Sequence, residues 1–113
     1  ALSAHPKIGA SWEGFVIENL LSVVPHGTQP WFYRSSGGAE IDLLLDLPGS
    51  ERWAVEIKRS HAPQPDRGFH TACADTIPTK KLLVYPGMER FPLGDGIEAI
   101  PIIDLTRMLA GIG

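Results

Sequence analysis

The sequence predicts an α/β domain in which a mixed sheet is flanked by helices, with the elements in the order α-β-β-β-α-β-β-α. Apolar residues recur with helical spacing over residues 9–24, and short strand patterns follow over 31–34, 38–47 and 53–58. A second helical pattern then leads into a strand at 80–85. A strand, a helix and a strand in succession indicate a right-handed crossover, so we expect a parallel pair within the sheet.

The size and composition of the chain limit the classes of protein to which it can belong. Its 113 residues suffice for one hydrophobic core and are too few for two, so we expect a single domain over residues 1–113. No apolar run is long enough to cross a bilayer and no signal sequence is visible, so a cytoplasmic location is expected. The chain begins without Met and reads as mid-chain, which suggests a fragment of a longer protein.

Charge and cysteine content give two further constraints. The formal net charge of −3 argues mildly against binding nucleic acid by bulk electrostatics, although a site that touches only a few phosphates is compatible with it. The single cysteine, Cys73, excludes an internal disulfide and a cysteine-based zinc cluster. We expect its thiol in the core.

The first helix carries a carboxylate on its apolar side. Val16, Ile17 and Leu20 follow Glu13 by three, four and seven positions, so all four side chains share one face. A carboxylate among aliphatic side chains is costly unless it is paired or bound to a metal. Glu13 is therefore a candidate site residue.

The central strands 38–47 and 53–58 alternate apolar and polar residues around a turn at 48–50, which predicts an antiparallel hairpin. The expected apolar face consists of Ile41, Leu43, Leu45, Leu47, Trp53, Val55 and Ile57. If Asp42 lies across from Glu56 or Lys58, two carboxylates and an ammonium gather on the other face. A divalent cation relieves the repulsion between such carboxylates, and the lysine could steer a phosphate or help to activate a water.

The remaining segments complete the expected fold. A helix over 66–76 and a strand over 80–85 are followed by a loop over 88–96, a strand over 97–103 and a short helix capped by Asp104. The second helix is expected to bury Phe69, Ala72, Cys73 and Ile77, and Trp12, Trp31 and Trp53 are interpreted as core rather than as base-stacking platforms.

Each part of the proposed site also has an ordinary structural interpretation. Glu56-x-Lys58 alone is typical of an exposed strand face; Asp42 makes the two interpretations comparable, and Glu13 favours a site. Glu40 shares a face with Asp42 and could be a fourth ligand, although an exposed flank is the more common role for a glutamate. His61 follows Lys58 by three residues and could approach a phosphate, but a loop histidine is more often plain surface.

The order of these residues resembles the restriction-endonuclease-like, or PD-(D/E)xK, nuclease superfamily. That superfamily builds its metal site from a helix glutamate, a strand aspartate and a strand Glu-x-Lys, and Glu13, Asp42, Glu56 and Lys58 occupy those places. Residues 5–15, 38–42 and 55–58 also resemble the nuclease-like C-terminal domain, of unknown function, of a class of prokaryotic AAA-type ATPases. One departure is that Ile41, rather than proline, precedes Asp42.

The resemblance implies a restriction-endonuclease-like fold, a DNA substrate and an upstream ATPase module. No Gly-x-x-x-x-Gly-Lys-Ser/Thr motif occurs within these residues. The first hypothesis is an endonuclease-like DNA hydrolase in which Asp42, Glu56 and Glu13 hold Mg²⁺ or Mn²⁺ and Lys58 assists the attacking water. The second is a catalytically idle binding or regulatory module of that ATPase, and a less favoured third is a metal-binding structural domain.

Overall fold

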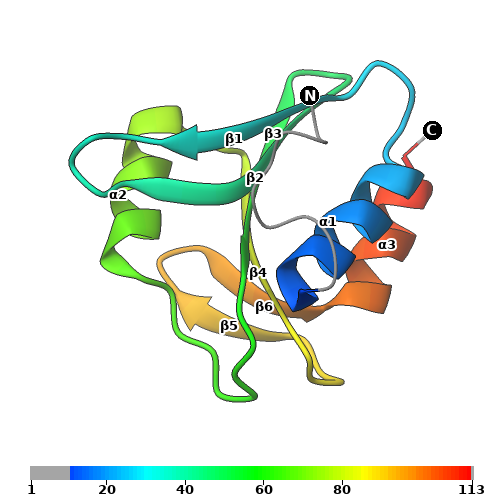
Figure 1. Ribbon diagram of the computed structural model, residues 1–113. Coiled ribbons are helices and arrows are strands. Elements are labelled where there is room, and N and C mark those ends of the chain that lie inside the picture. The colour runs from blue at the N-terminus through cyan, green and yellow to red at the C-terminus, as the bar shows by residue number, and fades with distance from the viewer. Residues whose placement is uncertain (1–10, 113) are drawn as a thin grey trace.

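A computed structural model describes residues 11–112 of the chain (Figure 1). Three helices and six strands follow one another in the order α-β-β-β-α-β-β-β-α, which confirms the predicted fold class. Their bounds are α1 Trp12–Val23, β1 Gln29–Arg34, β2 Glu40–Leu47, β3 Glu51–Ile57, α2 Arg67–Thr76, β4 Lys80–Tyr85, β5 Phe91–Gly94, β6 Ile97–Pro101 and α3 Ile102–Ala110. No helix within residues 11–112 is long and apolar enough to cross a membrane.

The six strands form one mixed sheet in the order β1-β2-β3-β4-β6-β5. β1, β2 and β3 are antiparallel neighbours, as the predicted hairpin requires. β3 and β4 are parallel, which confirms the crossover expected from the strand–helix–strand pattern. β4 and β6 are also parallel, and β5 pairs antiparallel with β6 at the edge. The sheet thus places β3 near its centre, between an antiparallel and a parallel neighbour.

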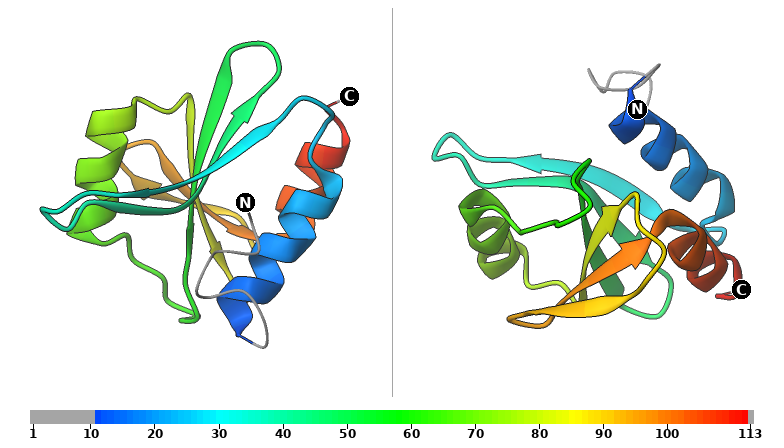
Figure 2. Two further views of the ribbon diagram at one scale, coloured as in Figure 1. Left: turned by 45° about the horizontal axis from the view of Figure 1, so that its top comes forward. Right: turned by 90° about the horizontal axis from the view of Figure 1, so that it is seen from below.

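Helices cover both faces of the sheet and create two hydrophobic layers (Figure 2). The layer on the α1 and α3 side contains Val16, Ile17, Leu20, Leu43, Leu45, Leu47, Trp53, Val55, Ile57, Leu82, Val84, Ile100, Leu105 and Leu109. The layer on the α2 side contains Ala39, Ile41, Leu44, Ala54, Phe69, Ala72, Cys73, Leu83, Tyr85, Ile97 and Ala99. Because β2, β3 and β4 contribute to both layers, the central sheet is buried on both faces.

The last third of the chain differs from the predicted elements. The segment 88–96, predicted as a loop, contains β5, so the fold has one more strand than expected. The strand predicted over 97–103 ends at Pro101, and the next two residues already belong to α3. Pro101 is the residue before that helix, whereas Asp104 lies in its first turn rather than at its cap. Proline cannot donate a ladder hydrogen bond, so it favours the end of the strand.

A β-bulge in β2 overturns the predicted face of Ile41. Trp31 pairs with Leu44 and Tyr33 with Ile41, so two steps along β1 correspond to three along β2. An extra residue reverses the alternation of side chains from that point. Ile41 therefore packs in the α2 layer, whereas Leu43 packs in the α1 and α3 layer.

Some of the residues predicted to lie in the core are buried, and others are exposed. Trp53, Phe69 and Cys73 are buried as predicted. Trp31, by contrast, is 52% exposed on the edge strand β1, and Ile77 is 79% exposed. Ile77 follows the last turn of α2 with φ +52°, a left-handed conformation that directs the chain away from the helix. Both assignments to the core were wrong.

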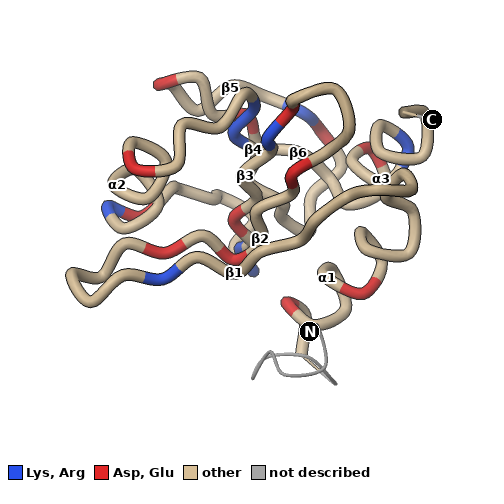
Figure 3. Tube along the Cα trace, turned by 90° about the horizontal axis from the view of Figure 1, so that it is seen from above, with Lys and Arg blue, Asp and Glu red and all other residues tan. Residues whose placement is uncertain are grey.

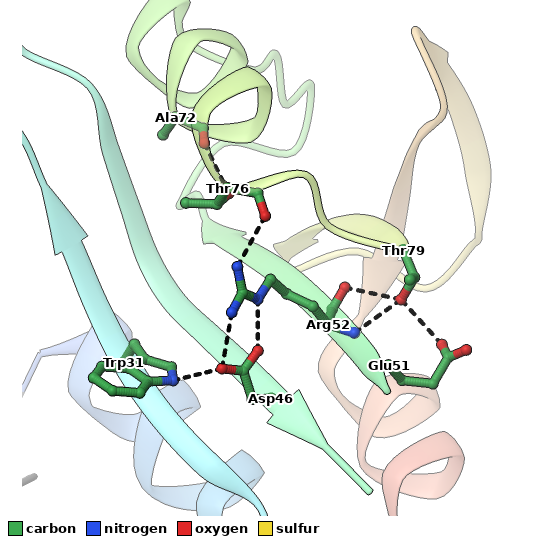
Figure 4. A network of polar contacts seen from close by, with 7 residues as sticks. All are labelled: Trp31, Asp46, Glu51, Arg52, Ala72, Thr76 and Thr79. Atoms are coloured by element: carbon green, nitrogen blue, oxygen red, sulfur yellow. Dashed lines mark hydrogen bonds and ion pairs between the residues drawn. The ribbon is translucent and has the colours of Figure 1, made fainter. Parts of the chain in front are cut away.

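The end of the β2–β3 hairpin nearest its turn is held by a polar network (Figure 4). Arg52 donates from Nε to Asp46 Oδ1 at 2.6 Å and from Nη1 to the carbonyl of Thr76 at 2.9 Å. Trp31 donates to the same aspartate at 2.8 Å, and the backbone N–H of Arg52 donates to Thr79 Oγ1 at 2.9 Å. These contacts connect β1, β2 and β3 to the end of α2.

The start of α2 packs closely against the chain that leads into β2. A Cβ atom added at Gly68 would lie 2.5 Å from the carbonyl oxygen of Gly38, which is too close for two non-bonded atoms. Gly38 itself has φ +93°, a conformation that favours glycine. The contact between these two glycines lets α2 approach the sheet beside the pocket described below.

We predict that Gly68→Ala destabilises the chain by about 1–3 kcal/mol, because the new methyl group must displace a backbone carbonyl. The helical propensity of alanine would act in the opposite direction by about 1 kcal/mol, and we expect the clash to dominate. Urea unfolding measures the difference. Gly37→Ala is the matched control, since its nearest neighbour, Ser35 Oγ, would be 3.9 Å away. Equal stability of the two variants would contradict this account of the contact.

Candidate functional site

One pocket of about 290 Å³ lies where the start of β2, the end of β3, and the N-termini of α1 and α2 meet. Its lining is strongly acidic. The lining residues are Glu13, Gly38, Glu40, Asp42, Glu56, Ile57, Lys58, Asp66, Gly68 and Phe69. All four residues singled out from the sequence, Glu13, Asp42, Glu56 and Lys58, are therefore brought together from three separate segments.

The end of β3 supplies a buried carboxylate and the ammonium beside it. Glu56 is only 5% exposed and is the one buried charged residue within residues 11–112. Its neighbours in sequence, Val55 and Ile57, pack in the α1 and α3 layer, so alternation places Glu56 on the α2 side. The ammonium of Lys58 lies 3.2 Å from Glu56 Oε2 and 2.7 Å from Asp66 Oδ2.

Asp42 lies at the bulge in β2 and contacts the end of β3 through its side chain. The paired register between the two strands runs from Leu47 opposite Glu51 to Leu43 opposite Val55. Beyond that point the Asp42 side chain makes the connection, because its Oδ2 accepts a hydrogen bond from the N–H of Ile57 at 2.8 Å. Bulges often occur beside functional sites, where they redirect a side chain.

The N-terminus of α1 brings Glu13 to the same pocket. Ser11 caps this helix by accepting a hydrogen bond from the N–H of Gly14 at 3.0 Å. Trp12 donates from its indole Nε1 to the carbonyl of Lys58 at 2.9 Å. The N–H of Lys58 donates to Val84 in β4 at 2.8 Å. The backbone of Lys58 is therefore held on both sides, and the residue next to Glu13 is tied directly to it.

Burial dominates the electrostatics of Glu56. The pKa of this carboxyl is raised from 4.5 to about 7, with burial as the largest cause and the neighbouring carboxylates of Asp66 and Asp42 acting in the same direction. Lys58 opposes the shift through charge and hydrogen bonding. Burial lowers the pKa of Lys58, but its contacts with Asp66 and Glu56 outweigh that effect and leave the pKa raised. Lys58 is thus a stable cation beside a carboxylate whose charge is poorly compensated.

The donor chemistry of the pocket suits a hard divalent cation. Mg²⁺ and Mn²⁺ prefer carboxylate oxygens, and Glu13, Asp42 and Glu56 offer them around one pocket. One oxygen of Glu13, Oε2, is shielded from solvent. In the side-chain positions of the structure, no group of three acidic, histidine or cysteine side chains within residues 11–112 is arranged to hold a metal ion. Lys58 lies against Glu56, and Asp42 is turned toward the backbone of Ile57.

Three residues considered from the sequence have different positions. Glu40 lines the pocket and pairs with Arg34 at 3.4 Å, so it is neither a plain solvated flank nor a residue that faces only the pocket. His61 is exposed and is not among the lining residues. Asp46, a polar residue of the predicted strand 38–47, belongs to the network with Arg52.

Asp66 is the site residue that the sequence reasoning missed. The sequence predicts it as the first residue of the second helix, and it stands at the N-cap of α2. Its position ten residues after Glu56, at the start of a helix that returns to the sheet, is the signal that could have indicated it. The indole contact of Trp12 was also missed, since a tryptophan beside an apolar stripe reads as core.

Comparison with known proteins places the chain in a family. A family model described as "Domain of unknown function (DUF4143)" matches residues 8–105. The chain belongs to this family. It is also 41% identical over 102 residues to "Uncharacterized protein Mb2031c" of Mycobacterium bovis and to "Uncharacterized protein Rv2008c" of Mycobacterium tuberculosis.

The match to these two relatives involves 89% of the chain but only 22% of their length, so both are much larger proteins. No solved structure gave a significant match. The matched range includes all four residues of the predicted site. It also includes every described helix and strand of this DUF4143 domain except the end of α3.

The raised pKa of Glu56 predicts a specific dependence of stability on pH. In the metal-free protein the folded-state pKa of about 7 exceeds the ordinary value of 4.5, so folding favours the protonated carboxyl. This contribution is complete below pH 4.5 and is lost as the pH rises through 7. We expect the wild type to lose up to about 3 kcal/mol more than Glu56→Gln across this range. Urea unfolding at several pH values measures this, and parallel curves would contradict it.

The indole contact predicts that Trp12→Phe costs about 1–2 kcal/mol, because the carbonyl of Lys58 loses its donor and the packing loses volume. Trp31→Phe is the matched control: it removes an indole hydrogen bond to Asp46 at an exposed edge strand, where we expect less than about 1 kcal/mol. Thermal unfolding of both variants makes the comparison. A smaller effect at Trp12 than at Trp31 would count against an anchoring role.

Proposed function

We propose that this domain is a metal-dependent phosphodiester hydrolase, endonuclease-like in its action on DNA. The observation that carries the proposal is the convergence of Glu13, Asp42, Glu56 and Lys58 on one pocket. These residues come from α1, β2 and β3, and they share neither a helix turn nor a single strand. Acidic and basic residue types that converge from distant segments are typical of a site for chemistry.

In this proposal Asp42, Glu56 and Glu13 hold Mg²⁺ or Mn²⁺. Bound among them, a divalent cation supplies Lewis-acid polarisation of a phosphate oxygen and makes a neighbouring water more acidic. The desolvated carboxylate of Glu56 supports this assignment, since a nearby cation lowers the cost of its charge. Glu13 contributes a ligand or contacts the cation through a water.

Lys58 provides the positive charge that the chain itself contributes. Its raised pKa keeps it protonated at neutral pH, so its ammonium can donate hydrogen bonds to a phosphate and stabilise negative charge that develops there. The backbone contacts with Trp12 and Val84 hold this residue at the pocket. Orienting the attacking water is a second role for the same group.

The partners belong to the proposal as well. The motifs at residues 5–15, 38–42 and 55–58 resemble a domain attached to AAA-type ATPases, and the relatives are much longer than this chain. We propose that an upstream ATPase module presents DNA to the pocket and that the activity is cytoplasmic. Such delivery would compensate for the low basic charge of the domain.

A second function, that of an idle binding or regulatory module, is favoured by a specific observation. Lys58 is engaged by Glu56 and Asp66, and no ready-made metal centre is present within residues 11–112. Lys and Arg positions are spread over several elements, and the net charge is −3 (Figure 3). In this reading the acidic pocket is retained by the fold without performing catalysis.

Cleavage assays distinguish the two functions. We expect the chain to cut linear, nicked or branched DNA in the presence of Mg²⁺ or Mn²⁺. Lys58→Ala and Asp42→Asn should each reduce the rate by at least about a hundredfold, since the first removes the ammonium that stabilises charge on the phosphate and the second removes a ligand of the cation. Glu18→Gln is the control, because Glu18 is exposed on α1 and does not line the pocket.

The outcomes separate clearly. Loss of cleavage in both pocket variants, with normal activity of the control, supports the hydrolase and excludes an idle scaffold. Absence of cleavage on every substrate, together with a metal affinity that Asp42→Asn leaves unchanged, overturns the hydrolase.

A further inference from the structure

The ammonium of Lys58 occupies a position between two carboxylates of the pocket. It lies 3.2 Å from Glu56 Oε2 and 2.7 Å from Asp66 Oδ2, while its side chain is 24% exposed. Glu56 is one of the proposed ligands and Asp66 is not. A fixed positive charge against a ligand opposes the approach of a second cation. Lys58 therefore stands where a divalent cation would have to compete with it.

The side chain of Asp66 pairs with Lys58 rather than with the first turn of its own helix. Aspartate at an N-cap commonly accepts a hydrogen bond from a backbone N–H of the first helical turn, and that bond stabilises the helix. The side chain of Asp66 makes no such bond to α2. It reaches Lys58 instead, although it is 67% exposed. The carboxylate of Glu56 approaches the same helix end, where its Oε2 accepts from the N–H of Asp66 at 3.4 Å.

We propose that Lys58 is the internal counter-ion of the pocket and that Asp66 is a positioning residue that retains its ammonium when Glu56 turns to a divalent cation. The proposal rests on the metal-dependent function above. With Asp66 present, Lys58 can leave Glu56 without losing its ion pair. Without Asp66, Glu56 is the one remaining ion-pair partner of the ammonium within residues 11–112, and the ammonium competes fully with the cation.

Metal titration by calorimetry, without DNA, tests this coupling. We compare the Mn²⁺ affinity of Asp66→Asn with that of the wild type, and we repeat the comparison in a Lys58→Met background. We expect the loss of affinity caused by Asp66→Asn to be about fivefold larger when Lys58 is present, as for an ion pair of moderate strength. Glu40→Gln is the matched control, because it removes one negative charge from the same pocket and no contact joins Glu40 to Lys58 within residues 11–112. Its effect should be the same in both backgrounds.

Each result decides the matter. An effect of Asp66→Asn that does not depend on Lys58 overturns the proposed role of Asp66 while leaving the metal site in place. Absence of Mn²⁺ binding in the wild type and in Lys58→Met overturns the metal site and this inference together. Circular dichroism establishes that every variant is folded, and Lys58→Gln replaces Lys58→Met if the latter does not fold.

Discussion

The burial of Glu56 is the constraint on which the arrangement of the pocket depends. A carboxylate that is 5% exposed near the end of a central strand requires partners, and the surrounding elements supply them. Lys58 follows two residues later on the same side of the strand, and the N-terminus of α2 approaches from the next segment. The positive end of a helix favours carboxylates nearby, so α2 and Lys58 act in the same direction. These partners reduce the cost of the charge without removing it, as the raised pKa of Glu56 indicates.

The bulge in β2 explains how one helix can cover an aliphatic face while its glutamate reaches an acidic pocket. Strict alternation would separate Leu43 and Asp42 onto opposite faces, with the α1 layer far from the carboxylates. The extra residue at the bulge interrupts this alternation. The backbone ladder to β3 ends at Leu43, and beyond it the carboxylate of Asp42 accepts a hydrogen bond from the N–H of Ile57. The N-terminus of α1 then extends to the place where the strands part, and Trp12 attaches it there. A site at the N-terminus of α1, where the ladder between β2 and β3 ends, is therefore compatible with a continuous core.

Much of the fold follows from local patterns, and the exceptions have physical causes. The apolar stripe from Val16 to Leu20 and the alternation after Leu43 predict buried faces because both depend on neighbours in sequence. The face of Ile41 depends on a register shift against β1, which no pattern within β2 reveals. The sequence does not predict β5 because its four residues include a proline and a glycine. This segment becomes a strand by pairing with β6. Trp31 was misplaced because hydrophobicity does not distinguish an edge strand from a central one.

The site shows the same division between local and tertiary information. Glu13, Asp42, Glu56 and Lys58 could be selected from the sequence because each stands out against its own element: a carboxylate on an apolar helix face, or charges that alternate with aliphatic residues. Asp66 does not stand out in this way, since an aspartate before a helix is the most ordinary of caps. Only the structure shows that its carboxylate turns from the helix to Lys58. A residue whose type satisfies a local rule while its contacts depart from that rule is hidden from sequence reasoning. Here that departure lies at the edge of the pocket, where Asp66 pairs with Lys58.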